Sequence, residues 1–196
     1  MAVPFVGLTG GLGAGKSTAL AQLASLGAAV LSADEVVHGL YATSAVADAV
    51  RERFGDGVFA GGEVDRRALG ARAFASEEDR RWLEQLLWPL VGDRAAAFYE
   101  QACRAQPAPP AAVMEAPLLF ESGSQSRYAA TIAIVADDEL RAQRIAARDQ
   151  VALSQREERQ LPQAEKARRA TYVVINDGTV AELRARLAEV LRQLRP

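Results

Sequence analysis

Residues 7–20 read GLTGGLGAGKSTAL, and this stretch decides the class of fold. Residues 10–17 have the pattern Gly-x-x-x-x-Gly-Lys-Ser, which is the complete spacing of a P-loop, a turn that binds nucleotide phosphates. An apolar run of strand length, Val3 to Leu8, precedes the turn, and a helical pattern follows it, which Gly27 is well placed to end. Because the motif requires this strand–loop–helix context, we interpret the stretch as a phosphate-binding loop rather than a merely glycine-rich turn.

Each part of the loop has an expected task. Its glycines let backbone N–H groups turn toward phosphate oxygens, and the helix that begins near Lys16 adds its positive dipole end. Lys16 is expected to reach the β- and γ-phosphates and Ser17 to ligate Mg²⁺. Of 23 basic residues only Lys16 and Lys166 are lysines, which indicates that position 16 needs a compact ammonium. The residues expected to contact the nucleotide here are Gly11, Leu12, Gly13, Ala14, Gly15, Lys16, Ser17 and Thr18.

Continuous apolar runs recur along the chain with helical patterns between them. Runs of this kind are typical of strands that are buried on both faces of a parallel sheet. The alternation with helices predicts an α/β doubly wound fold with five parallel strands. The five predicted strands lie at 3–8, 28–31, 111–114, 131–135 and 172–175.

Two segments interrupt this alternation. Residues 39–106 contain helical patterns and no convincing strand, so we expect a helical insertion there. One of these patterns opens at Ser76 with Asp79 three residues on, which resembles a capping box with Asp in place of Glu. Residues 141–169 carry eight basic and four acidic side chains, and we expect a short arginine-rich lid. The predicted nucleotide-binding core therefore comprises 1–38, 107–140 and 170–196.

Two carboxylates follow predicted strands, at the edge where α/β sheets build their sites. Asp34 could accept a proton from an acceptor hydroxyl or help to place a metal; equally, it could be an N-cap of the helix that follows. Glu115 ends its strand as a Walker-B carboxylate does, so we expect it near the metal, although a helix or turn cap is the alternative.

Basic side chains within 141–169 lie at helical spacing. Arg144 and Arg148 are four residues apart and share a helix face, where they could stabilise charge on a transferred phosphoryl group. A solvated basic helix is the alternative. His38 is the only histidine, and a structural zinc site around it is improbable because no cysteine lies nearby.

Composition narrows the class of protein. A net charge of −2 gives no general attraction to nucleic acid or to anionic membranes. No apolar stretch is long enough to span a membrane, and the opening residues are a poor signal peptide. The single cysteine excludes an intrachain disulfide and a cysteine-based metal cluster. We therefore expect a cytoplasmic soluble protein that acts as a monomer or a weak homo-oligomer.

Taken together, several stretches resemble the dephospho-CoA kinase family over nearly the whole chain. The resemblance rests on GLTGGLGAGKST at the start, VLSADEVVH at 30–38, VDRRALGARAF at 64–74 and EAPLLFE at 115–121. It continues with RIAARD at 144–149 and EKARRATYVVINDG at 165–178. The P-loop is shared by many families, whereas the Pro-Leu-Leu-Phe-Glu loop combined with the two arginine segments is more selective.

The resemblance implies transfer of phosphate from ATP, with Mg²⁺, to the ribose 3′-hydroxyl of dephospho-CoA in a P-loop kinase fold. It implies that Asp34 is the catalytic base, that Lys16, Arg144 and Arg148 are also catalytic, and that Asn176 and Gly178 lie beside the adenine. The metal would be held by Ser17 and Glu115. The substrate-binding residues it implies are Asp34, His38, Arg66, Pro89, Leu118, Leu119, Phe120 and Glu121.

The chain departs from the family pattern in three places. Ser32 stands where the family usually has an aspartate, and Trp88 stands where it has the histidine of a His-Pro pair. The segment between Arg148 and Arg156 is about three residues shorter than usual, near one helical turn. Two other functions stay open from the residues alone: another P-loop kinase acting on a nucleoside, nucleotide or small sugar acid, or a non-catalytic nucleotide-binding module.

Overall fold

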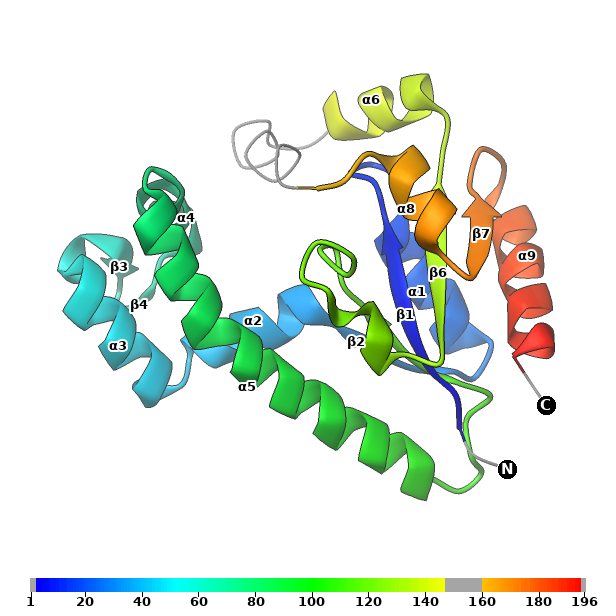
Figure 1. Ribbon diagram of the computed structural model, residues 1–196, viewed down its shortest axis with the longest axis horizontal. Helices are drawn as coiled ribbons and strands as arrows, with labels where there is room; N and C mark the ends of the chain where they lie inside the picture. Colours follow the sequence, from blue (N-terminus) through cyan, green and yellow to red (C-terminus); the bar gives the residue numbers. More distant parts are fainter. Residues whose placement is uncertain (1–2, 147–159, 195–196) are drawn as a thin grey trace. The chain divides into compact units, whose positions relative to one another are not determined.

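The computed structural model describes residues 3–146 and 160–194 (Figure 1). The chain packs as two compact units. One comprises Met1–Ser32 together with Ala97–Pro196, and the other comprises Ala33–Ala96. The second unit takes up most of the helical insertion expected over 39–106, but it begins earlier and ends earlier.

A five-stranded sheet forms the centre of the first unit. Every neighbouring pair is parallel, and the spatial order is β2-β5-β1-β6-β7. The strands are β1 (Phe5–Gly10), β2 (Ala29–Ser32), β5 (Ala112–Glu115), β6 (Ala130–Val135) and β7 (Tyr172–Ile175). Each lies within two residues of its predicted position, so the parallel α/β fold expected from the apolar runs is confirmed.

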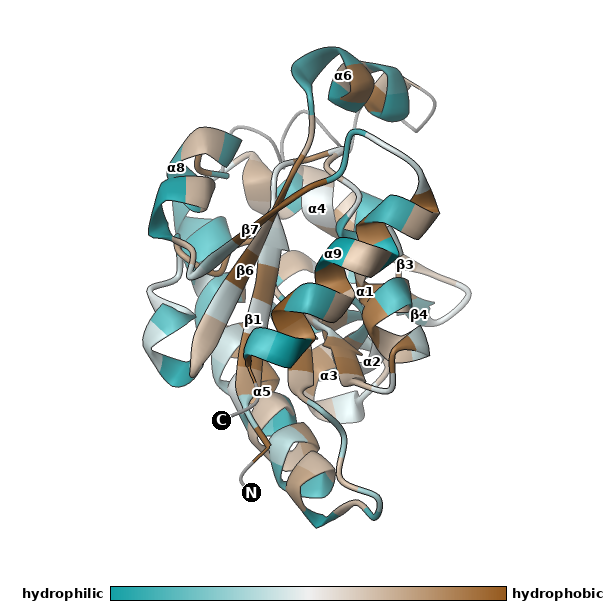
Figure 2. Ribbon diagram, turned by 90° about the vertical axis from the view of Figure 1, so that its right-hand side faces the viewer, coloured by the Kyte–Doolittle hydropathy of each residue, from teal (hydrophilic) through white to brown (hydrophobic). Residues whose placement is uncertain are grey.

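Two helices cover one face of this sheet, α1 (Lys16–Ser25) and α9 (Val180–Gln193). Leu23 of α1 and Leu187 of α9 are fully buried in one core with Val6, Leu8 and strand residues from β5, β6 and β7. Figure 2 shows hydrophobic residues along β1, β6 and β7, and both hydrophobic and hydrophilic residues on α9. The predicted stop of the first helix is also confirmed, because Gly27 follows α1 with φ +90°.

The opposite face of the sheet receives the end of the long helix α5 (Glu77–Arg104) and the loop that follows β5. Phe5 of β1 stacks on Tyr99, with ring centroids 4.9 Å apart, and lies 4.7 Å from Tyr128. Leu119 packs so closely over Gly7 that a Cβ at position 7 would collide with it. The glycine therefore lets this loop lie directly on β1. Among the residues that the structure describes, the unit also contains the short helices η2 (Ser124–Arg127), α6 (Asp138–Ala146) and α8 (Gln163–Arg169).

The second unit is mainly helical, with its own core. It contains α2 (Ala33–Tyr41), α3 (Ser44–Phe54), η1 (Asp56–Val58), α4 (Arg66–Phe74) and the first part of α5. Val46, Val50 and Leu69 are buried with Leu83 and Leu87 of α5. As expected, Ser76 starts α5, where its Oγ accepts a hydrogen bond from the N–H of Asp79 at 3.3 Å.

One expectation about this unit was wrong. The segment does contain strands, because β3 (Phe59–Ala60) and β4 (Glu63–Val64) form an antiparallel hairpin. Gly61 and Gly62 connect them with φ of +60° and +89°. Each strand has only two residues, which is too short for an apolar run or an alternation to be recognised.

Across the part of the chain that the structure describes, no helix combines the length and the apolar character needed to cross a bilayer.

Candidate active site

The phosphate-binding loop leaves the end of β1, the central strand, which lies between β5 and β6. Gly15 has φ +92° and joins the loop to α1, which begins at Lys16. The Lys16 ammonium lies over the loop, where it donates to the carbonyl oxygens of Gly10 at 3.1 Å and Gly11 at 3.0 Å. Ser17 and Thr18, in the first turn of α1, are exposed. The loop thus brings a cation, a helix N-terminus and two hydroxyls together, which is the combination that binds a triphosphate.

Asn176 contacts the phosphate-binding loop at Ala14. It follows β7 and is buried, and its side-chain amide donates to the carbonyl oxygen of Ala14 at 2.8 Å. A Cβ at position 15 would collide with the same amide, so the glycine there serves the approach of Asn176 as well as the positive φ. The asparagine therefore fixes the loop to the end of a second strand. Gly178 lies two residues on, exposed, just before the Thr179 cap of α9.

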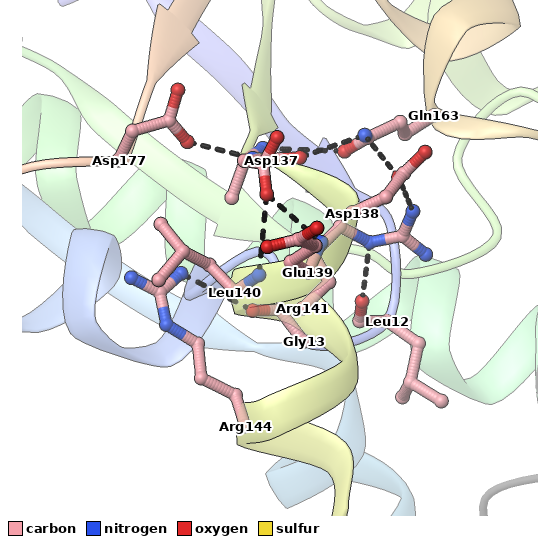
Figure 3. A network of polar contacts seen from close by, with 11 residues as sticks. Leu12, Gly13, Asp137, Asp138, Glu139, Leu140, Arg141, Arg144, Gln163 and Asp177 are labelled. Carbon is pink, nitrogen blue, oxygen red and sulfur yellow. Dashed lines mark hydrogen bonds and ion pairs between the residues drawn. The ribbon is translucent and has the colours of Figure 1, made fainter.

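Two arginines of α6 hold the loop from outside (Figure 3). Arg144 donates to the carbonyl oxygens of Gly13 at 3.4 Å and Asn176 at 3.1 Å. Arg141 donates to the carbonyl oxygen of Leu12 at 2.9 Å. The carbonyl oxygens of Leu12 and Gly13 belong to the phosphate-binding loop, so both guanidinium groups lie next to this loop.

The role of Arg141 was missed from the sequence. Its guanidinium also pairs with Asp138 at 2.7 Å, and Asp138 accepts from the side chain of Gln163 at 3.1 Å. Gln163, the first residue of α8, is in turn bonded to the backbone of Ala136. The signal was available, since Arg141 lies three residues before Arg144 and so shares its helix face.

The carboxylate of Glu115 ends β5, beside β1. Its neighbour in the register is Leu8, two residues before the end of β1. The side chain is buried, with 6% of the residue exposed, and Oε2 accepts a hydrogen bond from the Ser32 hydroxyl at 3.1 Å. Ser32, which stands where the family usually has an aspartate, thus supplies a neutral donor to this carboxylate. A carboxylate oxygen and a hydroxyl are the ligand types that Mg²⁺ prefers, so Glu115 and Ser17 fit such an ion.

The loop after β5 contains four of the eight residues expected to bind substrate, Leu118 to Glu121. Leu119 and Phe120 are buried, whereas Leu118 is partly exposed. The Glu121 carboxylate pairs with the ammonium of Lys166 at 3.0 Å and accepts from the backbone N–H of Leu161 at 2.7 Å. Lys166 is fully buried, and the sequence did not mark it as part of a site.

The remaining expected substrate-binding residues lie in the Ala33–Ala96 unit. Asp34 and His38 are both exposed and stand four residues apart, hence on one face of α2. Because α2 begins at Ala33, Asp34 lies within its first turn rather than at the N-cap position, where its charge favours the helix dipole.

Arg66 and Pro89 belong to α4 and α5. Arg66 is the first residue of α4, behind an N-cap formed by Asp65. Burial raises the pKa of Tyr41, at the end of α2, to about 12, and the charge of Arg66 opposes this rise. Pro89 is inside α5, next to Trp88, which is 45% exposed. Arg148 lies outside the described residues.

Comparison with known proteins places this geometry in a family. The family model described as dephospho-CoA kinase matches residues 4–182. The chain belongs to the dephospho-CoA kinase family. A dephospho-CoA kinase of Chromobacterium violaceum is 41% identical over 194 residues, covering 94% of this chain and 91% of its own. One from Bradyrhizobium diazoefficiens is 36% identical, covering 96% and 94%.

Solved structures agree with the fold. A protein from Thermus thermophilus is 33% identical, with a TM-score of 0.82 and full coverage of both chains. The dephospho-CoA kinase of Campylobacter jejuni has a TM-score of 0.65 at 22% identity and covers 99% of this chain and 98% of its own. A shikimate kinase from Aquifex aeolicus, at 14% identity and a TM-score of 0.54, shares the fold alone. The expected P-loop kinase fold is thereby confirmed.

Proposed function

We propose that this protein transfers the γ-phosphoryl group of ATP to the ribose 3′-hydroxyl of dephospho-CoA, giving CoA and ADP. One observation carries the proposal: the match to the dephospho-CoA kinase family runs through the P-loop, the loop after β5 and the end of β7. Kinases of this type need little covalent chemistry from the protein, because the transition state is loose and positioning dominates.

The nucleotide is assigned to the loop of residues 11–18. Lys16 and the backbone N–H groups would take the β- and γ-phosphates, as the position of the ammonium over the loop supports. Arg144, at the edge of the same loop, would stabilise charge on the transferred group, together with Arg148. Asn176 and Gly178 would lie beside the adenine.

Mg²⁺ is the expected companion of ATP. Ser17 would ligate it and Glu115 would hold it, directly or through its water shell. When bound, the ion neutralises charge on the phosphate oxygens. The protein would orient the Glu115 carboxylate for this ion, and the hydrogen bond from the Ser32 hydroxyl to Glu115 supports that role.

The acceptor is assigned to the Ala33–Ala96 unit and to the loop Leu118–Glu121. Asp34 would orient the 3′-hydroxyl and accept its proton, and His38, Arg66 and Pro89 would contact other parts of dephospho-CoA. The exposure of Asp34 and the shared helix face of Asp34 and His38 support this assignment. We further infer a cytoplasmic protein, a monomer or weak homo-oligomer, that needs no nucleic acid or membrane partner.

A substrate panel tests the proposal. ADP release is measured with ATP and Mg²⁺ against dephospho-CoA, AMP, UMP, uridine and gluconate, with Lys16→Ala as the inactive control. We expect release that depends on dephospho-CoA and is lost in the variant. Faster turnover of any other acceptor would contradict the assignment.

A further inference from the structure

Lys166 is a buried cation and, with Lys16, one of two lysines in a chain whose other 21 basic residues are arginines. It lies in α8 and is completely inaccessible to solvent. Its Nζ donates to the carbonyl oxygen of Pro117 at 2.5 Å, to Glu121 Oε1 at 3.0 Å and to Gln160 Oε1 at 3.5 Å. Burial lowers the pKa of Lys166, and the charges of Glu121 and Glu115 oppose that change. Three oxygen atoms thus lie within hydrogen-bonding distance of the ammonium nitrogen.

Two of these acceptors are the two ends of one loop, Pro117 and Glu121. The carbonyl oxygen of Pro117 also accepts from the hydroxyl of Thr9, in β1, at 3.4 Å. Glu121 Oε1 also accepts from the N–H of Leu161 at 2.7 Å. One ammonium and one carboxylate therefore connect the loop after β5, the strand that leads into the P-loop, and the residues just before α8.

Stability alone does not explain a charge at this place. Replacing a buried ion pair by apolar side chains is often neutral or stabilising, because taking two charges out of water is expensive. Glu121 Oε2 is itself buried, with no hydrogen-bond partner among the residues that the structure describes. What the pair does supply is a fixed geometry, since three acceptors from two segments, the loop after β5 and the residues before α8, converge on one ammonium.

The choice of lysine fits that geometry. A guanidinium is planar and presents its donors as a rigid fork, whereas an ammonium is a compact donor that serves converging acceptors. Arginine fills 21 of the 23 basic positions of this chain, yet this buried one is lysine. We expect that arginine would not fit here without moving Pro117 or Glu121.

We propose that Lys166 is a positioning residue for the acceptor: it fixes the loop Pro117–Glu121 at both ends, so that the partly exposed Leu118 has one defined position toward dephospho-CoA. This rests on the proposed function, which assigns the loop to that substrate. We expect loss of the ammonium to leave the P-loop side chains in place, because the hydrogen bonds of Lys16 to Gly10, of Arg144 to Gly13 and of Asn176 to Ala14 run within the loop and its neighbours. The effect should therefore fall on the acceptor rather than on ATP.

The test is steady-state kinetics of the whole protein, with ATP and dephospho-CoA varied separately. The variants are Lys166→Met, Lys166→Arg, Glu121→Gln and the double variant Lys166→Met/Glu121→Gln. Arg192→Met on α9 is the control, because it removes an exposed basic side chain far along the chain from these loops. We expect Lys166→Met to raise the KM for dephospho-CoA about tenfold or more while the KM for ATP changes less than about twofold.

The KM values for dephospho-CoA, compared across the variants, decide whether Lys166 positions the loop. We expect Lys166→Arg not to restore the acceptor KM, and the double variant to be no worse than Lys166→Met. Circular dichroism melts report folding; if Lys166→Met does not fold, Lys166→Arg, which keeps the positive charge and leaves Glu121 unchanged, must still raise the acceptor KM. Equal changes in both KM values, or none, would overturn the positioning role. Wild-type protein that does not phosphorylate dephospho-CoA would instead refute the proposed function.

Discussion

The side-chain amide of Asn176 donates a hydrogen bond to the carbonyl oxygen of Ala14 across 162 residues of sequence, at 2.8 Å. The bond joins the end of β7 to the middle of the phosphate-binding loop. Arg144 adds a second connection, because it donates to the carbonyl oxygens of both Asn176 and Gly13. The loop is therefore held by the last strand and by α6 as well as by the helix that follows it, which preorganises it for phosphate.

Asn176→Ala should loosen this loop. The change leaves the buried carbonyl of Ala14 without its side-chain donor, which costs about 1–3 kcal/mol of stability in such sites. We expect the KM for ATP to rise about threefold to tenfold, with a smaller change for dephospho-CoA. Val173→Ala, an exposed position on the same strand, is the control and should change neither KM. An unaltered KM for ATP in Asn176→Ala would show that the bond does not preorganise the loop.

Asp34→Asn tests the proposed general base. Amide and carboxylate have the same shape, but only the carboxylate accepts a proton at neutral pH. We expect ATP binding to persist, by calorimetry, while kcat falls by at least about 10². Glu35→Gln is the matched control, since Glu35 is the next residue, also exposed and also in the first turn of α2. Normal turnover by Asp34→Asn would rule out its role as proton acceptor.

Ser32→Ala tests the support of the metal site. The variant removes the hydroxyl that donates to Glu115 Oε2 at 3.1 Å. A hydrogen bond of this kind contributes about 1 kcal/mol, so the Mg²⁺ concentration for half-maximal activity should rise up to about fivefold. Ser44→Ala, at an exposed serine in α3, should leave the Mg²⁺ dependence unchanged. If wild type, Ser32→Ala and Ser44→Ala all needed the same Mg²⁺ concentration for half-maximal activity, Ser32 would not orient Glu115.

The sheet could be predicted from the sequence because its signals are local. Strands buried on both faces are short apolar runs, and the P-loop fixes which strand stands beside the phosphate site. The cap at Ser76 and the stop at Gly27 are likewise matters of a few neighbouring residues. The β3–β4 hairpin was missed because its strands have two residues each, although the adjacent Gly61 and Gly62 were a turn signal.

The supports of the site were harder to predict because they depend on contacts between distant segments. Nothing near Lys166 in sequence indicates that it meets Pro117, 49 residues away. Asn176 was expected beside the adenine, yet its bond to Ala14 can be seen only once β7 lies in the sheet. Arg141 differs, since its spacing from Arg144 was a usable signal. Side chains expected to contact the ligand can be recognised from sequence motifs. Side chains that hold the backbone in place can be recognised only from the folded structure.

The most direct test of the central claim is mass spectrometry of the acceptor after the protein is mixed with ATP, Mg²⁺ and dephospho-CoA. The account predicts that dephospho-CoA gains the mass of one phosphoryl group, that fragmentation places it on the ribose 3′-oxygen, and that Lys16→Ala gives no such product. An acceptor of unchanged mass, or phosphate at any other position, would contradict it.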